Sequence, residues 1–150
     1  MTPFVAFLHH LAAFTLVAAL AVEFVLLRGE LTVTRARQIL SADRIYGASA
    51  GLILVIGLAR VFHFEKGAAY YFHSIPFIAK LSLFVIVGLL SIYPTVQFLS
   101  WRTDVRQGRT PAATDEKVRR IRTIIHLQLA AIVLLILCAA LMAKGVGYFG

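Results

Sequence analysis

Two histidines and a glutamate lie within the first apolar stretch of the chain. Residues 2–28 read TPFVAFLHHLAAFTLVAALAVEFVLLR, about the length that crosses a ~30 Å hydrocarbon core. Ionisable side chains cost about 2.5 kcal/mol or more at the middle of a bilayer, so His9, His10 and Glu23 are expected to face a protein interior or to take part in chemistry. On a helix, His9 and Glu23 lie on nearly the same face, about 21 Å apart along the axis, whereas His10 lies on another face.

The composition is that of an integral membrane protein. Of the 150 residues, 60% are hydrophobic and 15% are charged, and the mean hydropathy is +0.85. The formal charge of +8 does not indicate a nucleic-acid partner, because the basic residues lie in short segments between apolar runs. Membrane topology and anionic lipid account for such segments. The lipid bilayer is therefore the first expected partner, and nucleic acid is not expected.

Four apolar runs predict four membrane-spanning helices, at about residues 4–27, 45–62, 77–99 and 123–143. Asp43 is expected to cap the second helix, and Gly47 and Gly51 are spaced for close packing of that helix against a neighbour. Because the connecting segments are short, the chain is predicted to form a single all-α domain over residues 1–150. We expect this domain to be an integral membrane, antiparallel four-helix bundle.

Lysine and arginine are concentrated in two of the predicted loops. The loops after the first and third helices hold most of them, at residues 28, 35, 37, 44, 102, 106, 109, 117, 119, 120 and 122. The loop between the second and third helices holds one lysine, Lys66, flanked by Arg60 and Lys80. Positive residues are retained on the cytoplasmic side of a membrane. We therefore expect a multi-pass protein of the bacterial cytoplasmic (inner) membrane with both termini extracytoplasmic.

This orientation gathers histidines and basic residues near the outer face: His9, His10, His63, His73, Arg60 and Lys80. A histidine there could ligate a haem iron, with a basic side chain reaching the propionates. The alternative, given equal weight, is that these residues are interfacial histidines and basic side chains that extend toward the headgroups.

A second polar pair is predicted near the cytoplasmic face. Glu23 and His126 both lie about one turn inside that face, on helices that neighbour each other in a closed bundle. Two interpretations remain open. The pair could relay a proton toward the cytoplasm, or it could form a packing hydrogen bond that satisfies two costly groups. The packing hydrogen bond is slightly favoured, because it satisfies both groups without requiring that the pair has a function.

Three short motifs carry a resemblance to known families. They are FLHHLAAF in the first helix, ADRIYG at the start of the second and AKL at the start of the third, within residues 4–100. With these motifs the chain resembles a poorly characterised bacterial family of four-helix predicted membrane proteins. It is also distantly similar to the HemJ-type protoporphyrinogen IX oxidases and the CopD-like membrane proteins. The resemblance implies haem b with His9 or His10 as the axial ligand to the metal, and Lys80 as a partner of the porphyrin carboxylates.

The leading hypothesis is a small membrane haem-binding protein with a redox or porphyrin-related oxidoreductase function. It would pass electrons between a quinone or porphyrin-like substrate and a membrane partner. The alternative is a cofactor-free structural or assembly subunit, whose Gly47 and Gly51 face and basic loops dock a second copy, another protein or anionic lipid.

The orientation is tested by a cysteine at position 108. In the Cys138→Ser background, Gly108→Cys should be labelled by a membrane-impermeant thiol reagent only after the cells are opened, because the basic loop is expected in the cytoplasm. Labelling from outside intact cells would reverse the orientation.

Overall fold

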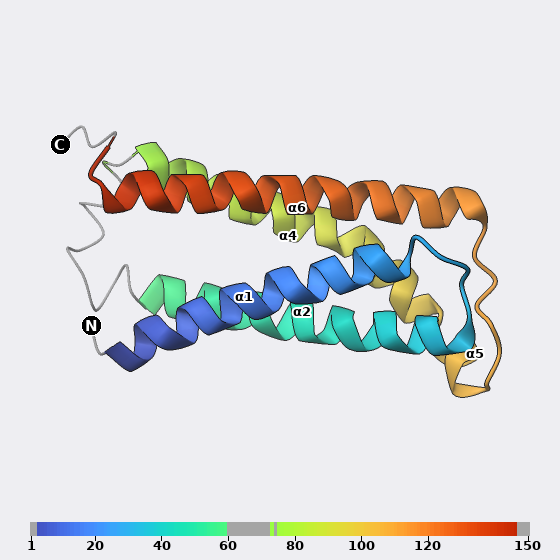
Figure 1. Cartoon of the computed structure of the whole chain (residues 1–150). Helices are drawn as coiled ribbons and strands as arrows, with labels where there is room; N and C mark the ends of the chain where they lie inside the picture. Colours follow the sequence, from blue (N-terminus) through green and yellow to red (C-terminus); the bar gives the residue numbers. More distant parts are fainter. Residues whose placement is uncertain (1–2, 60–72, 74, 147–150) are drawn as a thin grey trace.

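The computed structural model describes residues 3–59, 73 and 75–146, and these form an antiparallel bundle of α-helices (Figure 1). Four long helices are each apolar and long enough to cross a membrane: α1 (Pro3–Leu26), α2 (Val33–Ala59), α4 (Ile75–Ser100) and α6 (Asp115–Ala143). A short helix, α5 (Arg102–Arg106), follows α4. The predicted all-α, four-helix membrane architecture is confirmed.

Two of the helices begin well before their apolar runs. α2 starts at Val33 rather than near residue 45, and α6 starts at Asp115 rather than near residue 123. α6 has a strong start signal, because the Thr114 side chain accepts a hydrogen bond from the Lys117 backbone amide at 3.3 Å and two acidic residues occupy the first turn. Hydropathy marks the part of a helix that lies in lipid, and these helices continue beyond it.

The loop between α1 and α2 is held by Arg35. Its guanidinium donates to the Glu30 backbone carbonyl at 3.0 Å and passes directly over Gly29. A Cβ at position 29 would overlap this guanidinium, so a larger residue there would require the end of the Arg35 side chain to move. The short connection places α1 and α2 antiparallel and side by side (Figure 1).

The helices pack mainly as two pairs, α1 with α2 and α4 with α6, and α1 also contacts α6. The apolar core is densest toward the end of the bundle that carries α5, where Phe98 packs on Trp101 with ring centroids 5.2 Å apart. Leu20, Ile39 and Ile125 are also fully buried in this core. The beginning of α1 and the end of α6 lie at the opposite end of the bundle (Figure 1).

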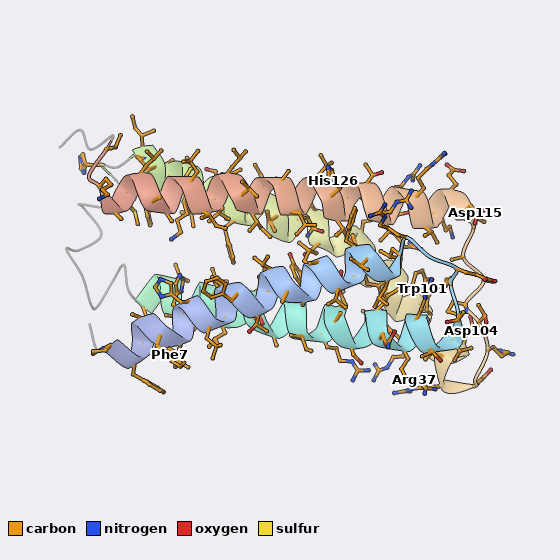
Figure 2. The ribbon with its side chains drawn as sticks, viewed as in Figure 1. Phe7, Arg37, Trp101, Asp104, Asp115 and His126 are labelled. Atoms are coloured by element: carbon orange, nitrogen blue, oxygen red, sulfur yellow. The ribbon has the colours of Figure 1, made fainter. Side chains whose placement is uncertain are left out.

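The outward faces of the helices are apolar. Phe7 projects away from α1 (Figure 2), and large hydrophobic side chains are exposed along all four long helices. Such a surface fits hydrocarbon rather than water. Gly47 and Gly51 belong to this outward surface, since a Cβ at either position would meet no atom within 4 Å. The two glycines therefore do not contact another helix among the described residues, and close packing against a neighbour stays a prediction for a second copy or another protein.

Candidate functional site: a polar centre between the four helices

Polar side chains from every long helix meet inside the bundle. Glu23 of α1 is 2% exposed, Asp43 of α2 is 8% exposed and Gln128 of α6 is 1% exposed, and Ser49 of α2 is buried as well. Thr95 of α4 completes the set through a hydrogen bond to Asp43. The name polar centre is used below for Glu23, Asp43, Tyr46, Ser91, Thr95 and Gln128.

Asp43 and Glu23 bring two carboxyl groups into the same region. Thr95 Oγ1 donates to Asp43 Oδ1 at 2.7 Å. The carboxyl groups of Glu23 and Asp43 are close enough for like charges on them to repel each other. Asp43 therefore does not cap a helix. It lies within α2 because that helix starts earlier than predicted, and its side chain joins α2 to α4.

Tyr46 connects the carboxyl groups to α4 and α6. Its hydroxyl accepts a hydrogen bond from Gln128 Nε2 at 3.1 Å and lies in hydrogen-bonding range of Ser91. Ser91 Oγ itself donates to the Gly88 carbonyl at 2.6 Å. The second amide hydrogen of Gln128 is donated to the Val87 carbonyl at 3.2 Å.

Two buried acceptor oxygens of this centre lack a donor. Among the described residues, Glu23 Oε1 and Gln128 Oε1 have no hydrogen-bond partner. A buried acceptor without a donor costs about 1–3 kcal/mol. Tyr46 bonds to Gln128 and interacts electrostatically with Glu23, so both oxygens belong to one neighbourhood. The centre has more acceptors than donors.

The predicted pairing of Glu23 with His126 does not occur among the hydrogen bonds of the described residues. Glu23 is buried, as its position on α1 predicts, but His126 lies exposed on α6 (Figure 2). The imidazole of His126 stacks on Phe24, with ring centroids 5.9 Å apart and the planes 35° apart. The predicted burial of Glu23 is confirmed, whereas the buried polar residue of α6 is Gln128, about half a turn beyond His126, and its side chain bonds to Tyr46 and the Val87 carbonyl.

The predicted outer cluster is described only in part, because Arg60 and His63 lie outside the described residues. His9 is half-buried against α2, with its Cε1 4.0 Å from the place where a Cβ of Gly57 would stand. His10 is exposed, and its Nδ1 lies 2.7 Å from the Ala6 carbonyl oxygen and so donates to it. The two imidazole rings meet edge to face at 6.1 Å.

The remaining residues of the cluster lie on or beside α4. Lys80 is half-buried within α4 and His73 is exposed before it. Within residues 3–59, 73 and 75–146, no group of three or more histidine, cysteine, aspartate or glutamate residues could hold a metal ion. A haem iron needs only one or two protein ligands, so this finding does not test a haem site.

Sequence reasoning missed most of the polar centre. Asp43 was assigned to a helix end, and Tyr46, Thr95 and Gln128 were not singled out. A usable signal existed: Asp43, Tyr46 and Ser49 recur every three residues along α2 and therefore drift slowly around one side of the helix. An uncharged polar side chain in the middle of a predicted span is, like a charged one, a candidate for a buried polar contact.

Comparison with known proteins identifies one family. A family model described as "Predicted membrane protein (DUF2214)" matches residues 2–147. No curated protein and no solved structure matches the chain. The similarity to the HemJ-type and CopD-like proteins therefore rests on the three short motifs alone.

The bond between Thr95 and Asp43 can be tested by replacing the donor. Thr95→Val keeps the side-chain shape but leaves Asp43 Oδ1 without its donor, so the free energy of unfolding in detergent should fall by about 1–3 kcal/mol. Thr95→Ser retains a hydroxyl and should cost less than about 1 kcal/mol. Equal effects of the two changes would mean that the hydroxyl does not stabilise the carboxyl group.

Proposed function

Since the chain belongs to the DUF2214 family of predicted membrane proteins, we propose that it transfers protons within the membrane and that Glu23 and Asp43 are the proton-binding groups. The observation that carries this proposal is the setting of Glu23. Its carboxyl group is almost completely buried, it has an acceptor oxygen without a donor among the described residues, and it lies near a second carboxyl group.

A shared proton accounts for this setting. Two neighbouring carboxyl groups in an apolar interior do not both ionise readily, because the charges repel and neither is solvated. One proton on the pair removes a charge and supplies the donor that the centre lacks. A purely structural hydrogen-bond network would instead be expected to satisfy its own acceptors.

Polar groups also extend from the centre along the bundle axis. On α4, Thr95 and Ser91 lie one turn apart, and Lys80 lies closer to the terminal end of the bundle. Lys80 and Phe98 are about five turns apart and so share the inward face of α4. His9 occupies the corresponding end of α1, on nearly the same face as Glu23. These groups are the proposed route between the centre and the outer end.

Proton transfer is measured with the whole chain reconstituted into liposomes that contain a pH-sensitive dye. When a potassium gradient and valinomycin impose an inward-driving potential, vesicles with the wild-type chain should acidify faster than protein-free vesicles. Glu23→Gln should reduce this excess rate at least about tenfold, because an amide cannot carry the proton.

Glu30→Gln is the matched control, because Glu30 is an exposed carboxylate of the α1–α2 loop and the same change there should leave the rate unaltered. A wild-type rate equal to that of protein-free vesicles, with insertion of the chain verified, would overturn the proposal. An excess rate that survives Glu23→Gln would do the same.

Haem b binding at the outer end is the second candidate, and the unequal setting of the two histidines favours it. His9 is half-buried beside a glycine of α2, where a porphyrin edge would meet no side chain at position 57, whereas His10 already donates to a backbone carbonyl and is exposed. We propose His9 as the axial ligand and Lys80 as the partner of a propionate. Haem bound there would supply one-electron chemistry, which a quinone or porphyrin-like substrate requires.

The haem proposal has its own spectroscopic test. Chain purified in mild detergent from haem-sufficient cells should show a Soret band and reducible b-type bands. His9→Ala should abolish these bands, His10→Ala should retain them, and Lys80→Ala should weaken haem retention less than loss of the ligand does. A folded preparation that stays colourless after haem is added would exclude haem and leave proton transfer or the structural-subunit alternative.

A further inference from the structure

Four arginines from two helices line one cavity at the end of the bundle that carries α5. The cavity has a volume of about 370 Å³, and its lining residues are Arg37, Leu40, Arg44, Arg102, Val105 and Arg106. Arg37 and Arg44 belong to α2, and Arg102 and Arg106 belong to α5. Leu40 and Val105 are buried and form the apolar part of the lining.

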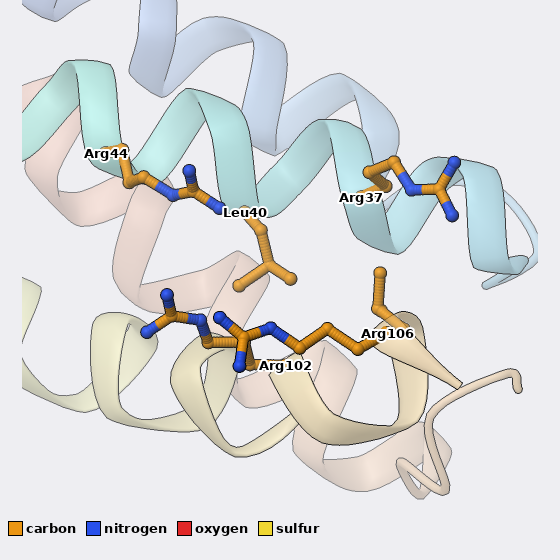
Figure 3. Close-up of a pocket in the computed structure, with 6 residues that line it drawn as sticks. Arg37, Leu40, Arg44, Arg102 and Arg106 are labelled. Atoms are coloured by element: carbon orange, nitrogen blue, oxygen red, sulfur yellow. The ribbon is translucent and has the colours of Figure 1, made fainter. Parts of the chain in front are cut away.

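Three of the four guanidinium groups lie in the same part of the cavity. Figure 3 shows the side chains of Arg102 and Arg106 lying next to each other beneath Leu40, with Arg44 reaching toward them from α2. Arg37 also lines the cavity, but its guanidinium extends along α2 away from the other three (Figure 3). Three of the four positive charges therefore surround the same region.

Among the residues that the structure describes, no carboxylate lines this cavity. The ion pairs of the described residues join Arg109 to Asp104 and Arg120 to Glu116, and they involve none of the four arginines. Asp104 lies between Arg102 and Arg106 in sequence, but its Oδ1 accepts from Arg109 Nη2 at 3.1 Å. Like charges held together without a counter-charge repel, so the cavity favours an anion.

The guanidinium groups and the position of the cavity indicate which kind of anion it binds. Guanidinium groups match the oxygen geometry of phosphate and can bind it through two parallel hydrogen bonds. α2 and the segment from α4 through α5 are both candidate membrane spans, and the cavity lies at their arginine-rich end, where lipid headgroups lie. The apolar lining beside the arginines suits the glycerol and first methylene groups of a lipid.

From these observations we infer that Arg37, Arg44, Arg102 and Arg106 form a binding site for the phosphate of an anionic phospholipid headgroup. Bound lipid would neutralise the repulsion between α2 and α5. It would also fix α5 against the end of the bundle, next to the loop that connects α5 to α6. The site is separate from the polar centre and does not depend on proton transfer or haem.

The single tryptophan gives a local readout, because Trp101 precedes Arg102 and is buried at the base of α5. Detergent-solubilised full-length chain is titrated with phosphatidylglycerol, with phosphatidylcholine and with inorganic phosphate, while Trp101 fluorescence and the mass of the intact complex are recorded. Phosphatidylglycerol should bind and saturate, and phosphatidylcholine should bind at least about tenfold more weakly.

Two double variants with the same loss of charge locate the site. Arg102→Gln/Arg106→Gln should weaken phosphatidylglycerol binding at least about tenfold, whereas Arg119→Gln/Arg120→Gln, on exposed α6 positions outside the cavity, should change it less than about twofold. Equal weakening by the two variants would overturn the site in favour of diffuse charge attraction. Inorganic phosphate binding as tightly as phosphatidylglycerol would overturn the lipid as its ligand.

Discussion

Burying Glu23 and Asp43 in an apolar bundle is the constraint on which the rest of the structure depends. Each carboxyl group loses its hydration when the helices associate, and that cost must be offset inside the protein. α4 supplies the Thr95 hydroxyl to Asp43, while α2 and α6 meet through Tyr46 and Gln128. The two main helix pairs, α1 with α2 and α4 with α6, are joined across this centre.

This constraint also explains why the bundle differs along its length. The polar centre lies near the middle of α2 and α6, whereas the α5 end contains the densest apolar core, with Phe98 packed on Trp101, and most of the positive charge. Toward the beginning of α1 and the end of α6 the lining of the bundle is more apolar, and His9 and Lys80 are half-buried there. The proposed proton transfer would use this difference in polarity along the bundle.

Much of the fold was predictable from the sequence, because membrane spans are defined by hydropathy and length. The four spans, the membrane setting and the burial of Glu23 all follow from apolar periodicity. The starts of α2 and α6 could not be predicted in this way. Beyond the hydrocarbon layer, the residue at which a helix begins is determined by caps such as Thr114 and by packing. Because α2 starts at Val33, Asp43 lies within the helix rather than at its end.

The partners within the site were the least predictable part. Helical periodicity places a side chain on a face, but it does not say which residue of a neighbouring helix stands opposite. His126 was the predicted polar residue of α6 in this region, but it lies against Phe24. Gln128, two residues further along, is the residue that reaches Tyr46. Gly47 and Gly51 show the same limit, because their spacing permits close packing and yet they face outward.

Measuring the protonation state of Glu23 and Asp43 tests the proposed proton site most directly. Infrared spectra of the reconstituted chain at neutral pH should contain the carbonyl band of a protonated carboxyl group. The band should be lost in Glu23→Gln/Asp43→Asn and kept in Glu30→Gln. A wild-type spectrum without that band, or a band unchanged in the double variant, would contradict a shared proton at the centre of the bundle.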